Sequence, residues 1–125
     1  MGKYFLLKTE FVFDSAHSLR NYEGKCKNIH GHTWKVEIWI KGDSSKLDET
    51  GILFDFTNVQ KLKEKLDHKY LNQEIPFFMD WNPTAENISL FVYEELKKIR
   101  NDLFYKVRIY ETLVGKTTYC EYGDF

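Results

Sequence analysis

The first part of the chain alternates between apolar and polar residues in two runs, and this pattern predicts two β-strands. One run covers about residues 3–17 and the other about residues 32–41, with a loop rich in Asn, Gly and Lys between them. Alternation with a period of two is typical of a strand that has one face on a core and the other in solvent. Gly42 and the Asp-Ser-Ser that follows then break the pattern as a turn.

The middle of the chain changes to a helical pattern. Thr57 and Gln60 have the spacing of a capping box and predict the start of a helix. That helix would carry its apolar stripe at Val59, Leu62 and Leu66. The short apolar run just before Thr57 is either a small strand or the packed approach to this helix.

A second helix is predicted after an irregular stretch that contains Pro76 and Pro83. Thr84 is a suitable N-cap for it, because a threonine side chain can accept a hydrogen bond from a free backbone N–H of the first turn. The apolar stripe of this helix comprises Ile88, Phe91, Val92, Leu96 and Ile99.

The alternating pattern returns at the end of the chain, in residues 104–111 and, after a turn at Gly115, in residues 117–122. The order strand, strand, helix, helix, strand, strand predicts an α+β fold with a four-stranded antiparallel sheet and two helices on one face. We expect a single domain over residues 1–125, because dividing 125 residues would leave two undersized cores. Such a sheet leaves two edges exposed, so we expect several subunits to close their sheets into a ring.

Composition narrows the class of protein. The 18 basic and 19 acidic residues nearly cancel, so no net field attracts the chain to nucleic acid or to a membrane surface. No segment approaches the roughly 20 apolar residues that span a bilayer, and the apolar patch near the N-terminus is too short for a signal peptide. We therefore expect a cytoplasmic protein. Aromatic residues make up 17% of the chain, which supports subunit interfaces, where such residues are enriched.

The chemistry-bearing residues concentrate between His17 and His32, where three of the four histidines and one of the two cysteines occur. In a hairpin, His17, His30 and His32 can converge from one face of two paired strands, and three histidines with an open position describe a catalytic zinc site. Cys26 is then either a fourth ligand or a reactive thiol held off the metal. The alternative is that these histidines are ordinary polar groups of a loop. Gly31 either relieves crowding between its neighbours or forms a bulge.

Three further positions could take part in chemistry. Asp67 and His68 lie at the end of the first predicted helix, where they form either a proton relay or a solvated surface pair; a mutual hydrogen bond requires the helix to end there. Glu111 ends a strand and could accept two hydrogen bonds from a guanidine-like ligand edge. Glu86 lies in the first turn of a helix, where the helix dipole is sufficient to explain a carboxylate.

Taken together, these residues resemble a known family. The chain is similar to the 6-pyruvoyltetrahydropterin synthase family, and within it to the 6-carboxytetrahydropterin synthases of queuosine and related deazapurine biosynthesis. The segments that carry the resemblance span nearly the whole chain: Phe13-Asp14-Ser15-Ala16-His17, Cys26-x-x-x-His30-Gly31-His32, Asp55-Phe56, Leu66-Asp67-His68-x-Tyr70-Leu71-Asn72, Asn82-Pro83-Thr84-Ala85-Glu86-Asn87 and Tyr110-Glu111-Thr112.

The resemblance implies the tunnelling fold, in which subunits form a trimeric barrel and two trimers stack into a homohexamer. The implied zinc ligands are His17, His30 and His32. The implied catalytic residues are Cys26 as general base or acid and Asp67 with His68 as a proton relay. The implied substrate contacts are Glu111, which would anchor the pterin from a neighbouring subunit, with Thr84 and Glu86 in support.

The implied reaction is that of a zinc-dependent lyase, which converts 7,8-dihydroneopterin triphosphate to 6-carboxy-5,6,7,8-tetrahydropterin with release of acetaldehyde and triphosphate. The three residues between Cys26 and His30 favour this carboxy branch. Two alternatives stay open: a 6-pyruvoyl synthase, which keeps the side chain whole, and a non-enzymatic binding module with a structural zinc. Lys25 and Lys27 flank the cysteine and are candidates for contacting the triphosphate.

Overall fold

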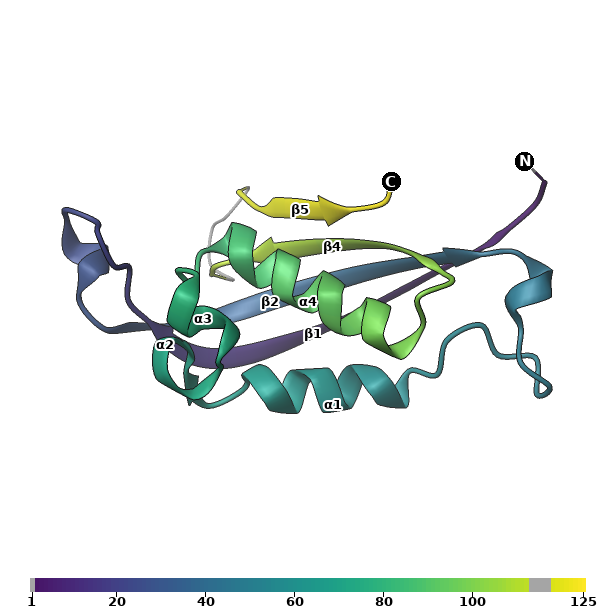
Figure 1. Cartoon of the computed structure of the whole chain (residues 1–125), viewed down its shortest axis with the longest axis horizontal. Helices are drawn as coiled ribbons and strands as arrows, with labels where there is room; N and C mark the ends of the chain where they lie inside the picture. Colours follow the sequence, from purple (N-terminus) through teal and green to yellow (C-terminus); the bar gives the residue numbers. More distant parts are fainter. Residues whose placement is uncertain (1, 113–117) are drawn as a thin grey trace.

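The computed structural model describes residues 2–112 and 118–125, and it is built on a mixed five-stranded sheet with the strand order β3-β1-β2-β4-β5 (Figure 1). The strands are β1 (Phe5–His17), β2 (His30–Gly42), β3 (Lys69–Tyr70), β4 (Phe104–Tyr110) and β5 (Cys120–Gly123). The helices are α1 (Thr57–Leu66), α2 (Leu71–Glu74), α3 (Phe77–Asp80) and α4 (Ala85–Ile99), with single 3-10 turns at η1 (Lys25–Lys27) and η2 (Ser44–Lys46).

The α+β class and the four main strands are as predicted, but the sheet has a fifth strand. β3 pairs in parallel with β1, at Ser15 and Ala16. Its two residues are too few to show an alternating pattern, so the sequence carried no signal for it. Ser15 of β1 links the end of α1 to the start of β3. Its hydroxyl donates to the carbonyl of Leu66 and accepts from the backbone N–H of Lys69 at 3.1 Å. The predicted turn at Gly115 and the first residue of the last predicted strand, Thr117, lie outside the described residues.

The two long helices occur where they were expected, and two short ones, α2 and α3, replace the irregular stretch before α4. Thr84 is the N-cap of α4, and its hydroxyl accepts from the backbone N–H of Asn87 at 3.1 Å. The capping box at Thr57 was wrong: the carboxylate of Asp55 instead accepts from the Thr57 N–H at 2.9 Å. Before α1 there is no strand but a packed approach, in which Leu53 and Phe54 are buried.

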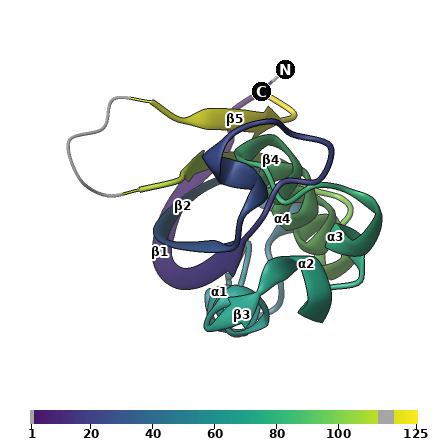
Figure 2. The ribbon, with the colours of Figure 1, turned by 90° about the vertical axis from the view of Figure 1, so that its left-hand side faces the viewer.

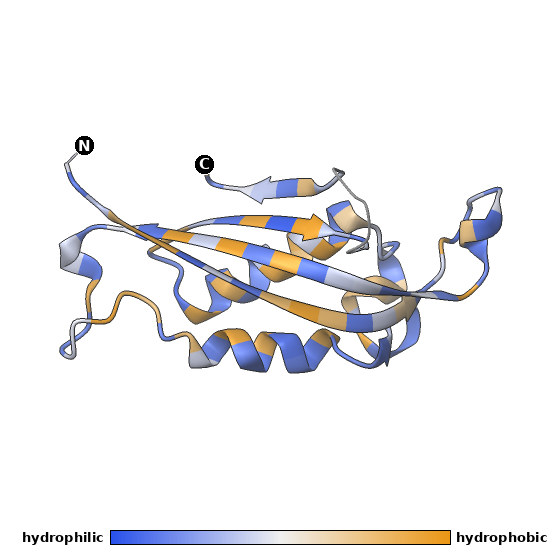
Figure 3. Cartoon of the chain, turned by 180° about the vertical axis from the view of Figure 1, so that it is seen from behind, coloured by the Kyte–Doolittle hydropathy of each residue, from blue (hydrophilic) through white to orange (hydrophobic). Residues whose placement is uncertain are grey.

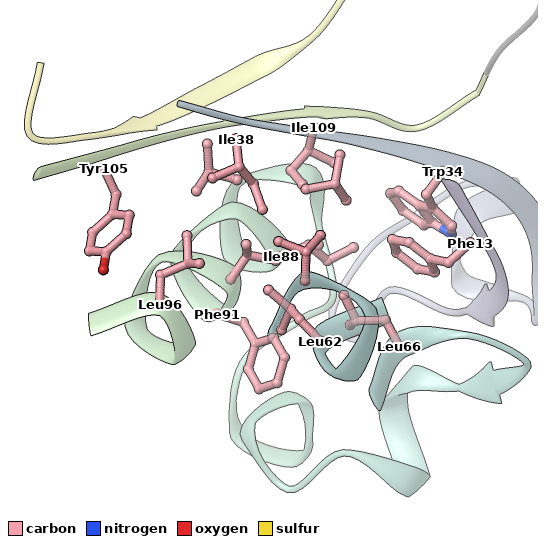
Figure 4. Close-up of a cluster of buried hydrophobic side chains, with 14 of the residues drawn as sticks. Phe13, Trp34, Ile38, Leu62, Leu66, Ile88, Phe91, Leu96, Tyr105 and Ile109 are labelled. Carbon is pink, nitrogen blue, oxygen red and sulfur yellow. The ribbon is translucent and has the colours of Figure 1, made fainter. Parts of the chain in front are cut away.

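The helices lie on one face of the sheet, as Figure 2 shows end-on. β1 and β2 form the predicted antiparallel hairpin, and the core fills the space between these strands and the helices. Figure 4 shows side chains from β1, β2 and β4 meeting those of α1 and α4. The labelled members are Phe13, Trp34, Ile38, Leu62, Leu66, Ile88, Phe91, Leu96, Tyr105 and Ile109. Ile99, assigned to the stripe of α4, is the exception: it is the last residue of the helix and is 39% exposed.

The other face of the sheet carries no helix and is called the open face below. The strands show alternating hydrophilic and hydrophobic bands when viewed from behind (Figure 3). Charged and aromatic side chains interleave on this face: the guanidinium of Arg108 lies 4.9 Å from the centre of the Trp39 ring, and the ammonium of Lys8 lies 2.9 Å from a carboxylate oxygen of Glu37. In the described part of the chain, no helix is long and apolar enough to cross a membrane.

Candidate metal centre

The register of the β1–β2 hairpin brings the three predicted histidines together. His17 pairs with His30, and Ser15 pairs with His32, so that all three imidazoles point to the helix-covered side at one end of the sheet. One ring nitrogen from each of the three lies within 4.8 Å of the others. The predicted convergence is therefore confirmed. Gly31 has neither expected role, since pairing runs through it without a bulge and a Cβ there would meet nothing within 4 Å.

Hydrogen bonds to backbone carbonyls orient two of these rings. Nδ1 of His17 lies 2.7 Å from the carbonyl oxygen of Pro83, and Nδ1 of His30 lies 2.7 Å from that of Asn28. A carbonyl oxygen only accepts, so each Nδ1 carries the hydrogen, and in the neutral ring each Nε2 presents a lone pair. This arrangement, with one ring nitrogen held by the protein, is the usual one for metal-binding histidines.

The remaining nitrogens fit a metal ion. Nε2 of His17 and Nε2 of His32 are buried and have no hydrogen-bond partner, which a folded protein rarely tolerates without a ligand. Burial lowers the pKa of both imidazoles, which favours the neutral form that binds a cation. Three imidazoles with room for one further ligand suit Zn²⁺, and also ions of copper, iron and nickel.

Two asparagines hold the segment that follows His17. Asn72 bonds both backbone groups of Ser18, accepting from its N–H at 2.9 Å and donating to its carbonyl at 2.8 Å. Asn82 does the same for Arg20, at 2.9 Å in both directions. Neither asparagine has a local sequence pattern that predicts this role, although both lie in segments that carry the family resemblance.

Cys26 lies in η1, within the loop that joins β1 to β2, and its thiol is free and partly buried. Its backbone carbonyl accepts from the N–H of Leu19 at 2.8 Å, which ties the two sides of the loop together. Among the described residues, the group of converging donor atoms at this site contains the three histidines and not Cys26. The arrangement therefore favours a thiol held off the metal over a fourth ligand.

The same loop borders a cleft of about 650 Å³, whose described lining residues include neither Cys26 nor any of the three histidines. Ser18, which follows His17, lines it together with Asn28, whose carbonyl holds His30. Lys27 and Arg20 contribute positive charge to its walls, and Arg20 also donates from Nη2 to the carbonyl of Phe78 at 2.9 Å. Lys25 is not part of this lining, and Arg20 is a candidate that sequence reasoning missed, since a lone arginine in a loop carries no pattern.

Asp67 and His68 form the pair that the sequence allowed only if the helix stopped beside them. α1 ends at Leu66, and His68 takes a left-handed conformation with φ of 57°. Its Nδ1 consequently lies 3.0 Å from Oδ2 of Asp67. The backbone N–H of Asp14 donates to Asp67 at 2.8 Å and, together with His68, lowers the pKa of the Asp67 carboxyl.

This pair is not brought together with the three histidines of its own chain. It adjoins the side chain of Asp14, which accepts a hydrogen bond from Thr33 on the open face of the sheet. Successive residues of a strand point to opposite faces, so the side chains of Asp14 and His17 lie on opposite sides of β1. The imidazole of His68 is 79% exposed at that edge.

The three proposed substrate contacts have different surroundings. Glu111 follows β4, and its Oε2 lies 3.5 Å from Nε2 of His17 and 3.8 Å from Nε2 of His32 of the same chain, rather than facing the histidines of a neighbouring subunit as expected. The hydroxyl of Thr84 is used as a helix cap, and Glu86 is exposed in the first turn of α4. No hydrogen bond or ion pair between described residues links Glu86 to the histidines, so its part in substrate binding stays a prediction.

Comparison with known proteins points to one family. Residues 6–122 match the family model described as 6-pyruvoyl tetrahydropterin synthase. A 6-carboxy-5,6,7,8-tetrahydropterin synthase of Haemophilus influenzae is 29% identical over 143 residues, covering 96% of this chain and 99% of the relative. A 6-pyruvoyl tetrahydrobiopterin synthase of Dictyostelium discoideum is 32% identical over 127 residues, covering 90% and 93%. The structure of the Caenorhabditis elegans 6-pyruvoyl tetrahydropterin synthase superposes with a TM-score of 0.75 at 24% identity, over 98% of this chain and 97% of that one.

Proposed function

The chain belongs to the 6-pyruvoyl tetrahydropterin synthase family, and we propose that it is a zinc-dependent lyase that converts 7,8-dihydroneopterin triphosphate to 6-carboxy-5,6,7,8-tetrahydropterin, acetaldehyde and triphosphate. This reaction would place it in queuosine or deazapurine biosynthesis. The observation that carries the proposal is the set of three converging imidazoles, with a free cysteine outside the donor group.

His17, His30 and His32 would hold the zinc. When bound, the metal would supply Lewis-acid polarisation of the substrate's side-chain hydroxyls. The carbonyls of Pro83 and Asn28 keep two of the imidazoles in the orientation this requires, so these backbone groups are as much part of the centre as the ligands.

Cys26 would move protons to and from the substrate side chain. The loop that carries it borders the cleft, and a cysteine side chain can serve as a general acid or base. Arg20 and Lys27 would bind the triphosphate in the same cleft, since guanidinium and ammonium groups form charge-assisted hydrogen bonds with phosphate oxygens.

Asp67 and His68 would act as a proton relay in an assembled oligomer. Within one chain they lie on the opposite side of β1 from the metal centre. A homohexamer of two stacked trimeric barrels would place the pair of one subunit beside the metal centre of another. In that arrangement the exposed imidazole of His68 would exchange a proton with the substrate bound at the neighbouring centre.

The runner-up is the 6-pyruvoyl synthase reaction, in which triphosphate leaves and the side chain stays whole. The similarity to the Dictyostelium relative keeps this alternative open. A structural-zinc module is disfavoured because it needs Cys26 among the ligands, whereas the group of converging donors contains only the three histidines among the described residues.

Product analysis tests the proposal. Zinc-loaded protein is incubated with 7,8-dihydroneopterin triphosphate, and the products are identified by mass spectrometry. The proposal expects 6-carboxytetrahydropterin together with acetaldehyde. A 6-pyruvoyl product would assign the runner-up reaction, and absence of turnover with zinc bound would favour the structural-zinc module.

A further inference from the structure

The carboxylate of Glu111 occupies an unusual position against the histidine cluster. Its Oε2 is 3.5 Å from Nε2 of His17 and 3.8 Å from Nε2 of His32, so one oxygen lies near both buried nitrogens. Neither distance is that of a hydrogen bond, which would bring nitrogen and oxygen to about 2.7–3.2 Å. Both nitrogens lack any other hydrogen-bond partner.

Nδ1 of His17 faces the carbonyl of Pro83, so the ring hydrogen is on that nitrogen. Nε2 of the same ring then presents a lone pair, and it lies 3.5 Å from Oε2 of Glu111. A lone pair and a carboxylate oxygen at this distance repel each other unless a cation lies between them.

The spacing to two of the three histidines is close to what a shared metal ion requires, although Glu111 is not in the group of donors that all lie within 4.8 Å of one another. Zinc bonds of about 2.0–2.1 Å to nitrogen and oxygen in a tetrahedral arrangement separate any two donor atoms by roughly 3.3 Å. The separations of 3.5 Å and 3.8 Å exceed this by a few tenths of an ångström. Glu111 comes from the end of β4, next to β2, so it approaches the cluster from a different element than any of the three histidines.

We propose that Glu111 is an exchangeable fourth donor, which closes the metal centre when no substrate is present. The inference rests on the proposed function, which assumes a bound zinc ion and assigns Glu111 to binding the pterin of the substrate. One carboxylate cannot fill both positions at once. Seating of the pterin therefore draws Glu111 away and leaves the fourth position to the substrate hydroxyls. The side chain is 49% exposed, which allows it this movement.

The test replaces zinc with Co²⁺ in the full-length protein, because the visible d–d absorption of Co²⁺ reports its donors and geometry. Wild type is compared with Glu111→Gln and with Glu64→Gln, a control that alters an exposed carboxylate on α1. We expect Glu111→Gln to shift the d–d bands and to weaken Co²⁺ binding about ten-fold or more in competition with a chelating dye, while Glu64→Gln matches wild type. Glu111→Asp, which keeps the carboxylate, should retain most of the wild-type affinity.

Exchange is tested by adding 7,8-dihydroneopterin, the proposed substrate without its triphosphate, to the Co²⁺-loaded wild type. We expect the bands to change as the pterin saturates the site. Identical d–d bands and identical Co²⁺ affinity in wild type and Glu111→Gln would overturn the inference. Bands that stay unchanged when pterin is bound would also overturn it. If these results came from a protein that still turns over substrate, only the inference would fail. If wild type bound no Co²⁺ and His30→Ala changed nothing, the proposed metal centre would fail with it.

Discussion

The imidazole of His68 lies 3.0 Å from the carboxylate of Asp67, at an edge of the sheet that faces away from the three histidines of the same chain. The contact exists because α1 stops at Leu66 and the next two residues leave the helix, His68 in a left-handed conformation. Neighbouring residues inside a helix could not have met in this way.

The position of this pair predicts complementation between subunits. Chains with Cys26→Ala and chains with His68→Ala should each form inactive oligomers, whereas co-expressed mixtures should recover activity. In the mixture, an intact relay from one chain can meet an intact metal centre of another. The measurement is turnover per oligomer across mixing ratios.

The control for complementation mixes Cys26→Ala with His30→Ala. Cys26→Ala removes the thiol and His30→Ala removes a metal ligand, so no chain in that mixture carries both the thiol and the complete set of ligands, and no recovery is expected. Equal recovery in both mixtures, or none in either, would contradict a relay that acts between subunits.

Cys26→Ala and His30→Ala should separate catalysis from metal binding. Cys26 lies outside the converging donors, so its substitution should leave bound zinc near wild-type content and change the unfolding free energy by about 0.5 kcal/mol or less, while turnover is lost. His30→Ala should lose both zinc and turnover. Zinc per chain is measured by elemental analysis of purified protein, and zinc loss in Cys26→Ala would show that the thiol is a ligand.

Arg20→Gln and Lys27→Ala should each weaken recognition of the triphosphate, because both residues line the cleft of the loop that joins β1 to β2. A charge-assisted hydrogen bond contributes about 1.5–3 kcal/mol, so we expect KM to rise roughly ten-fold or more with a smaller change in kcat. Inhibition by inorganic triphosphate should weaken in parallel. Lys25→Ala, which removes a neighbouring charge that does not line the cleft, is the matched control, and an equal effect there would point to general electrostatic attraction instead.

Two glycine substitutions should differ in their effect on stability, one being nearly neutral and the other destabilising. A Cβ at Gly31 meets nothing within 4 Å, so Gly31→Ala should change the unfolding free energy of the metal-free protein by less than about 0.5 kcal/mol. A Cβ at Gly123 would lie 2.2 Å from the carbonyl oxygen of Tyr105, so Gly123→Ala should destabilise by about 1–3 kcal/mol as β5 is pushed from β4. Urea unfolding measures both free energies. A large loss of stability in Gly31→Ala would support the explanation that Gly31 relieves crowding between the histidines.

The metal-free protein should lose stability as the pH falls below about 6.5. Burial lowers the pKa of His17 and His32 from the ordinary value of 6.5 in the folded state. Above that pH both imidazoles are neutral in both states; on acidification the unfolded chain takes up protons first, which favours unfolding. Urea midpoints measured between about pH 7.5 and about pH 5.5 should fall, and a variant with both His17→Gln and His32→Gln should show a shallower slope. An unchanged slope in that variant would assign the acid sensitivity to other groups.

Local patterns in the chain predicted much of this protein. The alternating runs located the four main strands, the helical periods located α1 and α4, and the N-cap at Thr84 was correct to the residue. The three histidines could be grouped because a hairpin with a period of two brings its residues together in a predictable way. These features depend on neighbours that are close in sequence or on the simplest pairing of adjacent strands.

Other features had no local signal. β3, α2 and α3 are too short to show periodicity. The side chain that accepts a hydrogen bond from the first turn of α1 belongs to Asp55 rather than Thr57, because such a contact depends on backbone direction. The roles of Asn72 and Asn82 arise from hydrogen bonds to Ser18 and Arg20, which are more than 50 residues away in the chain.

The sequence by itself determined the fold class, the hairpin and the set of residues able to bind zinc. The tertiary structure alone decided how these residues are used: it left Cys26 outside the converging donors, set Asp67 and His68 on the far side of β1, and placed Glu111 over the imidazoles. The physical reason is that periodicity specifies which face of an element a side chain occupies. Whether two such faces meet depends on the packing and closure of elements far apart in the chain, and that packing is cooperative.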